Sequence, residues 1–257
     1  MRRAILSVLV VLTLAATGAK AQAPAAKEII VIAPGVMLFG GLRDLAASYE
    51  KETGIKVTVR SSGMGRIVND VKTLEPPSDV IFLPHELMST LSLDAGIKKG
   101  SFTPLGRSEM GLAVRAGTPH PDISTVEKLA AVLRSAKAVM RSNPAGGSMV
   151  ARVIENNVIK RPEFAGVNSP VSTKGEGGQA LARGEGDLAI QAICEILPYK
   201  EIELVGPLPR ELAAWIDMST AVSMRSNKLD EGMKFIRYVT RPEATALWTA
   251  KGTKRFE

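Results

Sequence analysis

The chain has few of the residues that build cross-links, metal sites and nucleic-acid surfaces. Its 257 residues include one cysteine, Cys194, and two histidines. A single cysteine excludes a disulfide within the chain, and this set forms no zinc-binding pattern, so we expect neither a metal nor another cofactor. Cys194 stands near Ile190, Ile193 and Ile196, which is typical of a core residue. Aromatic residues make up only 4% of the chain and its basic residues are scattered, which disfavours nucleic acid as a partner.

Long apolar runs are also missing, except near the N-terminus. Residues 5–16 are apolar apart from two hydroxyl residues. About a dozen residues are too few to span a bilayer, which takes roughly 20. Arg2 and Arg3 before this run and the small-x-small pattern at 19–21 match a cleavable signal peptide over residues 1–21, rather than a membrane anchor. We therefore expect a mature protein in the periplasm.

The charge of the mature chain is modest. Loss of Arg2, Arg3 and Lys20 with the signal peptide lowers the formal net charge from +7 to +4. A mild positive charge is compatible with an anionic ligand, although it also suits other acidic partners. The remaining residues are enough for one large domain or two lobes, and they can bury a core without disulfides.

The mature chain alternates apolar strands with amphipathic helices, which predicts mostly parallel sheets flanked by helices. Residues 28–33 form a continuous run rich in Ile and Val, as in a strand buried on both faces. The spacing of apolar residues predicts a helix over 42–51 that ends at Gly54. This first series continues with strands over 55–59 and 79–83 and helices over 65–71 and 85–95.

A second series predicts another α/β unit. It has strands over 110–115, 138–141, 188–192 and 203–208, and helices over 125–135, 147–156 and 178–183. An extended segment over 215–223 and helices over 229–251, interrupted at Arg241–Pro242, complete the chain. We predict lobe 1 over residues 22–108 and 220–257 and lobe 2 over residues 109–219, with crossings near 107–110 and 216–222.

Four turns between a strand and a helix are candidate anion sites. In open α/β sheets, ligands bind beyond the carboxyl ends of the strands, where the next helices begin. Residues 33–41, 60–66, 141–148 and 174–178 lie at such places and are rich in Gly or Ser. One such turn is often a plain helix cap, but several at equivalent ends of two units favour a shared anion site. The candidate contacts are Gly35, Met37, Ser61, Ser62, Arg66, Asn143, Ala145, Gly146 and Lys174, with Met37 open also to a packing role.

Three further side chains stand at the same ends of strands. His85 follows the strand over 79–83, and it is either a ligand or proton donor or an ordinary residue at a helix start. Gln191 and Glu195 stand at the end of the strand over 188–192. The chain contains neither a Gly-x-Ser-x-Gly nucleophile motif nor a phosphate-loop lysine motif.

Several segments together resemble the periplasmic molybdate-binding proteins. They are Asp44–Val57, Ser61–Gly63, Pro76–Ile81, Asn143–Gly147, Ala182–Ile190 and Phe235–Thr249. The resemblance covers most of the mature chain and implies a two-lobed type II periplasmic-binding-protein fold with the ligand cleft between the lobes. It also implies a monomer that serves the membrane subunits of an ABC importer. Ser61 and Ser62 carry over as ligand contacts, and Ala145 and Gly146 carry over by position.

The sequence departs from that family at two ligand positions. The first loop, Pro34–Met37, lacks the serine that the family offers there, and Gln191–Glu195 stands where the family often has a tyrosine. Basic residues near the turns favour a ligand with several carboxylates. These residues are Arg60, Arg66, Arg141 and Lys174. We therefore expect capture of a small anion, either a molybdate-like oxyanion or a di- or tricarboxylate.

The alternative is an enzyme on the same scaffold, because the chain also resembles periplasmic aconitate isomerase. Moving a double bond in a tricarboxylate needs a base near a carbon acid and cations near the carboxylates. In that case His85 or Glu195 would be the base, and the four basic residues would hold the substrate.

Overall fold

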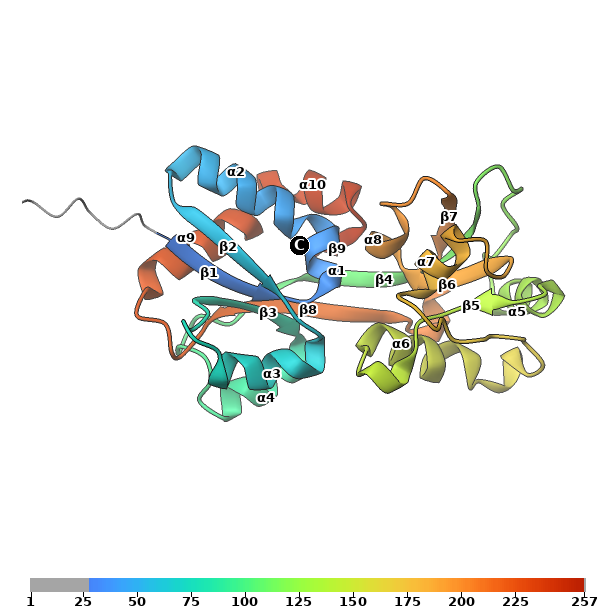
Figure 1. Cartoon of the computed structure of the whole chain (residues 1–257), viewed down its shortest axis with the longest axis horizontal. Helices are drawn as coiled ribbons and strands as arrows, with labels where there is room; N and C mark the ends of the chain where they lie inside the picture. The colour runs from blue at the N-terminus through green and yellow to red at the C-terminus, as the bar shows by residue number, and fades with distance from the viewer. Residues whose placement is uncertain (1–27, 257) are drawn as a thin grey trace, which may run out of the picture.

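Two lobes joined by two long strands make up the computed structural model, which describes residues 28–256 (Figure 1). The signal peptide predicted over residues 1–21 lies outside the described residues. No helix in this part of the chain is long and apolar enough to cross a membrane. The predicted two-lobed α/β architecture is confirmed.

The first lobe is built on strands in the order β2-β1-β3-β8-β4. β1 (Glu28–Ala33) pairs in parallel with β2 (Lys56–Ser61) and with β3 (Val80–Pro84). β8 (Trp215–Val222) runs antiparallel between β3 and β4 (Thr103–Arg115). The central strands β1 and β3 are almost entirely buried. Their burial explains why they read as continuous apolar runs.

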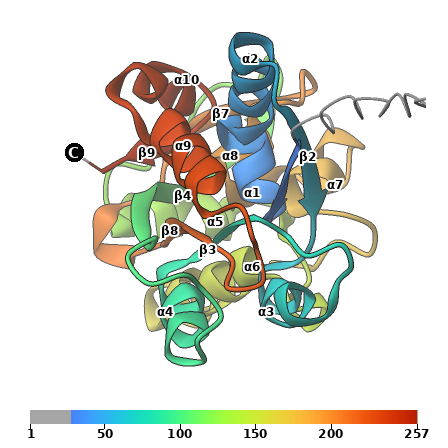
Figure 2. The ribbon, with the colours of Figure 1, turned by 90° about the vertical axis from the view of Figure 1, so that its left-hand side faces the viewer.

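Helices cover both faces of this sheet. Figures 1 and 2 show α2 (Arg43–Thr53), α9 (Leu229–Thr240) and α10 (Thr245–Ala250) on one face. They show α3 (Met64–Thr73) and α4 (His85–Leu93) on the other face. The sheets thus have both faces protected from water, as the alternating pattern of the sequence indicates.

The first helical segment starts earlier than the sequence indicates. Instead of a helix over 42–51, α1 (Gly35–Met37) and the π-helical turn η1 (Leu38–Leu42) lead directly into α2. The backbone bends at Gly41, where φ is 131°. A side chain there would be strained and would meet Leu247 and Trp248, so only glycine fits. Gly54, with φ of 68°, ends α2 as predicted.

The second lobe is a smaller mixed unit. β6 (Leu188–Ala192) runs antiparallel to β4 and parallel to β5 (Val139–Met140), while β7 (Ile202–Pro207) pairs with the other edge of β4. The helices of this lobe are α5 (Val126–Ser135), α6 (Met149–Ile154), which continues into η3 (Glu155–Ile159), α7 (Gly177–Ala182) and α8 (Ile193–Ile196). Short 3-10 turns occupy Pro144–Gly146, Pro162–Phe164, Arg210–Leu212 and Pro242–Ala244.

The two strands that join the lobes pair with each other from Thr103↔Thr220 to Glu109↔Trp215. β4 therefore begins seven residues before the predicted strand over 110–115. At Gly106 a Cβ atom would lie 2.4 Å from the Lys254 carbonyl oxygen, because β9 (Thr253–Arg255) also pairs with β4 there. The lobe limits proposed from the sequence remain a prediction.

Candidate functional site

A cavity of about 330 Å³ lies between the two lobes. Its volume is near the lower end of the roughly 300–1,000 Å³ typical of small-molecule sites. Lobe 1 contributes the start of α1 and the turn between β2 and α3, and lobe 2 contributes the start of α6 and two carboxylates. The lining residues are Pro34, Gly35, Val36, Ser61, Ser62, Gly63, Met64, Gly147, Ser148, Met149, Val150, Glu176 and Glu195.

Backbone N–H groups at three helix starts face this cavity. The first N–H groups of a helix have no carbonyl partner within it. In α3 the first bonds to carbonyl oxygens come from Arg66 and Ile67, which leaves the N–H groups of Met64 and Gly65 for a ligand. The first residues of α1 and of α6 lie at the cavity on opposite lobes, and each helix continues into a longer helical segment. The positive ends of the helix dipoles favour an anion between them.

Three serine hydroxyls lie at the cavity and differ in their hydrogen-bond partners. Ser62 Oγ donates to Asp70 Oδ2 at 2.6 Å, and Ser148 Oγ accepts from the Ala151 N–H at 3.2 Å as the cap of α6. Within residues 28–256 the Ser61 hydroxyl has no hydrogen-bond partner, and it is exposed. Ser61 is therefore the hydroxyl most available to a ligand.

Two glutamates form the lobe 2 wall of the cavity, and one buried amide connects them. Gln191 Nε2 donates to Glu195 Oε2 at 2.5 Å and lies 3.4 Å from Glu176 Oε2. Ser142 Oγ lies 2.8 Å from Oε1 of the Gln191 side chain, and it also contacts the Glu176 carboxylate. Gln191 has no exposed surface, so this network is fixed within the lobe.

Burial and the neighbouring carboxylate of Glu176 raise the pKa of Glu195 to about 7. The hydrogen bond from Gln191 acts in the opposite direction and is the smaller effect. A carboxyl group with a pKa near neutral exchanges protons readily at physiological pH, as a general acid or base must. Cys194 precedes Glu195 on α8 and is completely buried. Burial raises the pKa of its thiol, so the cysteine is not a nucleophile.

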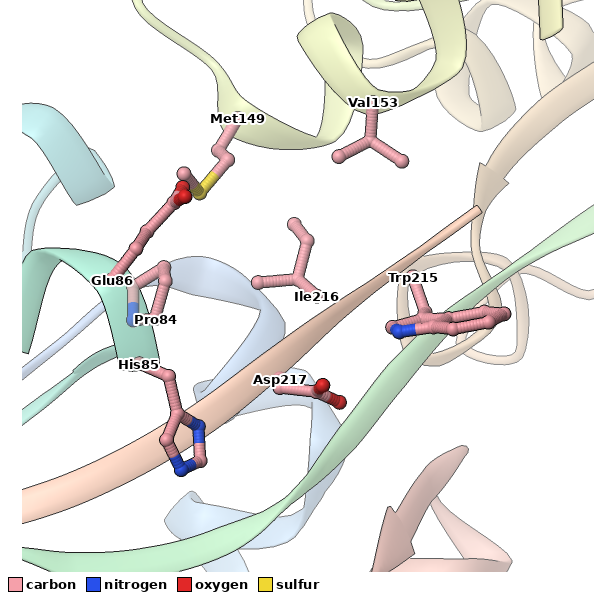
Figure 3. Close-up of a pocket in the computed structure, with 8 residues that line it drawn as sticks. All are labelled: Pro84, His85, Glu86, Met149, Val153, Trp215, Ile216 and Asp217. Atoms are coloured by element: carbon pink, nitrogen blue, oxygen red, sulfur yellow. The ribbon is translucent and has the colours of Figure 1, made fainter. Parts of the chain in front are cut away.

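A second cavity of about 290 Å³ is lined by residues of both lobes and shares Met149 with the first cavity. Figure 3 shows His85 and Glu86 at the start of α4, Met149 and Val153 on α6, and β8 between them. His85 packs edge-on against Phe102 and Phe256, with ring centroids 5.5 and 5.9 Å away. Its buried Nδ1 atom has no hydrogen-bond partner among the described residues. His85 and Glu195 thus line different cavities.

The four basic residues expected around the ligand do not line the first cavity. Arg60 donates to the Pro76 carbonyl oxygen at 2.6 Å, and Arg66 pairs with Asp70 at 3.4 Å. Arg141 donates to the Ser169 carbonyl oxygen and lies 3.8 Å from Glu155. Lys174 is exposed on the turn before α7. The predicted cation cluster is therefore not assembled in this structure.

The other candidates divide between the cavity and its surroundings. Gly35, Ser61 and Ser62 line it, and Gln191 stands behind its wall. Met37 has no exposed surface and belongs to the core, which fits the packing role. Asn143 Oδ1 accepts from the Ala145 N–H at 2.9 Å, so it caps the 3-10 turn that ends at Gly146. Gly147, the next residue, does line the cavity.

Several lining residues were not named as contacts from the sequence, among them Ser148, Met149, Val150 and Glu176. Ser148 precedes an apolar helix, and a serine at that place is a signal for a cap. Glu176 lies inside the predicted turn 174–178, but Lys174 was the charged residue proposed there as a ligand contact. Among residues 28–256 no three His, Cys, Asp or Glu side chains are grouped to hold a metal ion.

Comparison with known proteins identifies the family. The chain belongs to the bacterial extracellular solute-binding proteins, whose family model matches residues 30–254. Aconitate isomerase from a Pseudomonas species is 26% identical over 247 residues, which cover 95% of this chain and 93% of that enzyme.

Solved structures of other binding proteins share the fold. The periplasmic molybdate-binding protein of Azotobacter vinelandii has a TM-score of 0.66 and 18% identity, and covers 89% of this chain and 100% of its own. The sulfate-binding protein SubI of Mycobacterium tuberculosis has a TM-score of 0.64 and 18% identity, and covers 90% of this chain and 88% of its own. This solute-binding protein therefore has the type II architecture expected from its sequence.

Proposed function

We propose that this protein captures a small anion between its lobes in the periplasm and delivers it to an ABC importer. The observation that carries the proposal is the convergence of three helix starts, from both lobes, on one cavity with Ser61. An anion there would be held by N–H groups of both lobes at once. It would therefore favour the closed arrangement of the lobes over an open one.

The cavity also limits the kind of anion. About 330 Å³ suits a molybdate-like oxyanion or a small di- or tricarboxylate. Because no arginine or lysine among residues 28–256 lines it, the charge of the anion would be balanced by helix dipoles and by hydrogen bonds from backbone N–H groups. This arrangement supports recognition by neutral donors rather than by ion pairs.

Isothermal titration of the mature protein with molybdate, tungstate, sulfate, citrate and trans-aconitate tests the proposal. Ligand binding to the folded state also raises the melting midpoint, which gives a second readout. We expect heat and a melting shift with at least one of these anions. No response to any of them would contradict anion capture.

A second function, isomerisation of a tricarboxylate, is favoured by one observation, the Glu195 carboxyl group in the cavity with its pKa of about 7. In such a reaction the Glu195 carboxylate would take a proton from a methylene carbon of the substrate. The resulting carbanion would be stabilised by delocalisation into its carboxylate, and the proton would return to another carbon as the double bond moves. The similarity to aconitate isomerase supports this candidate.

Incubation with trans-aconitate, followed by proton NMR for the cis isomer, tests the second function. Glu195→Gln should abolish turnover, since an amide cannot accept the proton. His85→Ala is the matched control, because His85 lines the other cavity. Equal rates in the wild type and Glu195→Gln would exclude Glu195 as the base.

A further inference from the structure

The two carboxylate oxygens of Glu195 have different surroundings. Oε2 of this carboxylate accepts from Gln191, whereas Oε1 has no hydrogen-bond partner within residues 28–256. Oε1 faces the start of α1 on the other lobe, 3.5 Å from where a Cβ of Gly35 would stand. An anion bound at that helix start would therefore have its oxygens beside Oε1.

Few charges nearby offset the two glutamates. α1, η1 and β6, which pack against α8, carry no ionisable side chain. On β4, Arg107 pairs with Asp217, Arg115 donates to carbonyl oxygens, and Glu109 lines a different cavity. On β7, Glu203 pairs with His120 at 3.1 Å. Cys194, on α8 itself, is neutral because its thiol is buried.

The consequence is a conflict of charge inside the cavity. Helix starts attract an anion, but an anionic oxygen next to an ionised Glu195 would place two negative oxygens in contact, and burial of the Glu195 carboxyl group limits their screening by water. Glu176, 3.4 Å from the same amide, adds to the repulsion. A proton between the ligand oxygen and Oε1 removes the conflict and supplies a hydrogen bond.

We propose that the cavity takes up its anion together with one proton, which lies between a ligand oxygen and Oε1 of Glu195. The proposal rests on anion capture as the function. The ligand class is then a carboxylate or oxyanion whose oxygen can accept a proton from Glu195 or share one with it. Above the pKa of Glu195, affinity falls about tenfold for each pH unit, because the proton must first be taken from solvent.

Isothermal titration with trans-aconitate and with molybdate, in two buffers of different ionisation enthalpy, measures the protons taken up. At about pH 8 we expect one proton per ligand bound by the wild-type protein. Glu195→Gln should bind with an affinity that does not vary with pH and should take up no proton, since an amide already carries its hydrogens. Glu185→Gln, on the surface and paired with Arg183, is the matched control and should behave like the wild type.

The outcomes separate this inference from the function on which it rests. Heat without proton uptake, and with a flat pH profile, would overturn proton-coupled binding but leave anion capture intact. An absence of heat with both probes from about pH 6 to about pH 8 would count against capture of these anions and against proton coupling together. If Glu195→Gln does not fold, the pH series on the wild type still decides, because proton uptake is measured there directly.

Discussion

Arg107 and Asp217 face each other on the two strands that join the lobes, and their side chains form a two-point ion pair. Arg107 Nε lies 2.7 Å from Asp217 Oδ1, and Nη2 lies 3.0 Å from Oδ2. The guanidinium group also lies 4.0 Å above the Trp215 ring. Because β4 and β8 carry both crossings, this cluster holds the two strands together where they pass from one lobe to the other.

Asp217→Asn should lower the free energy of unfolding by about 1–2 kcal/mol, because it replaces a charge-assisted, partly buried pair. Asp94→Asn is the control. It removes a pair with Lys72 in which both side chains are about half exposed, and such pairs contribute about 0–1 kcal/mol. Urea unfolding of both variants makes the comparison. Equal losses in the two variants would show that the Arg107–Asp217 pair stabilises no more than a surface pair.

Ser61→Ala should weaken binding of an anion about fivefold, which corresponds to about 1 kcal/mol for one hydrogen bond, with little change in melting temperature. Ser62→Ala should instead lower the melting temperature, since Ser62 donates to the buried Asp70. Titration and thermal melting of the two variants separate the roles. A large loss of stability in Ser61→Ala would contradict its assignment as a free hydroxyl.

The parts of the fold that the sequence predicted are those set by local pattern. β1 and β6 have the predicted bounds because a run of mostly apolar residues marks a strand buried on both faces. The early part of β4 and all of β9 were missed. There the pairing of Gly106 with the chain end near Lys254 decides the structure, and no local signal reports a contact between segments so far apart.

The candidate site was predicted at the level of turns but not of side chains. The turns at 60–66 and 141–148 do meet at one cavity, as the rule for carboxyl ends of strands implies. The arginine side chains do not reach the cavity, because each one bonds to an acceptor outside it. Arg60, for example, donates to the Pro76 carbonyl group. Which acceptor a side chain reaches depends on the folded chain, so the sequence alone does not indicate these partners. The Gln191 amide between Glu176 and Glu195 could not be predicted for the same reason.

Gly177→Ala should destabilise the protein by about 1–3 kcal/mol, as overpacking does. A Cβ atom at this position would lie 2.6 Å from the Cα atom of Arg141, so the start of α7 would have to move away from β5. Gly178→Ala is the neighbouring control, because its Cβ would meet nothing closer than 3.6 Å. Urea unfolding measures both. A neutral Gly177→Ala would mean that α7, and with it Glu176, is not held against β5 as described.

Glu195 should make the wild-type protein less stable as the pH rises from about 4.5 to 7. Its pKa is about 7 in the folded state and near 4.5 when unfolded, so in this interval the folded state holds a proton that the unfolded state has released. Stability therefore falls with rising pH, by at most about 3 kcal/mol once the pH exceeds 7. Glu195→Gln should remove this loss and be the more stable protein at about pH 8, whereas Glu185→Gln should follow the wild type. Urea unfolding at a series of pH values gives the three curves, and parallel curves for the wild type and Glu195→Gln would mean that the folded state does not raise this pKa.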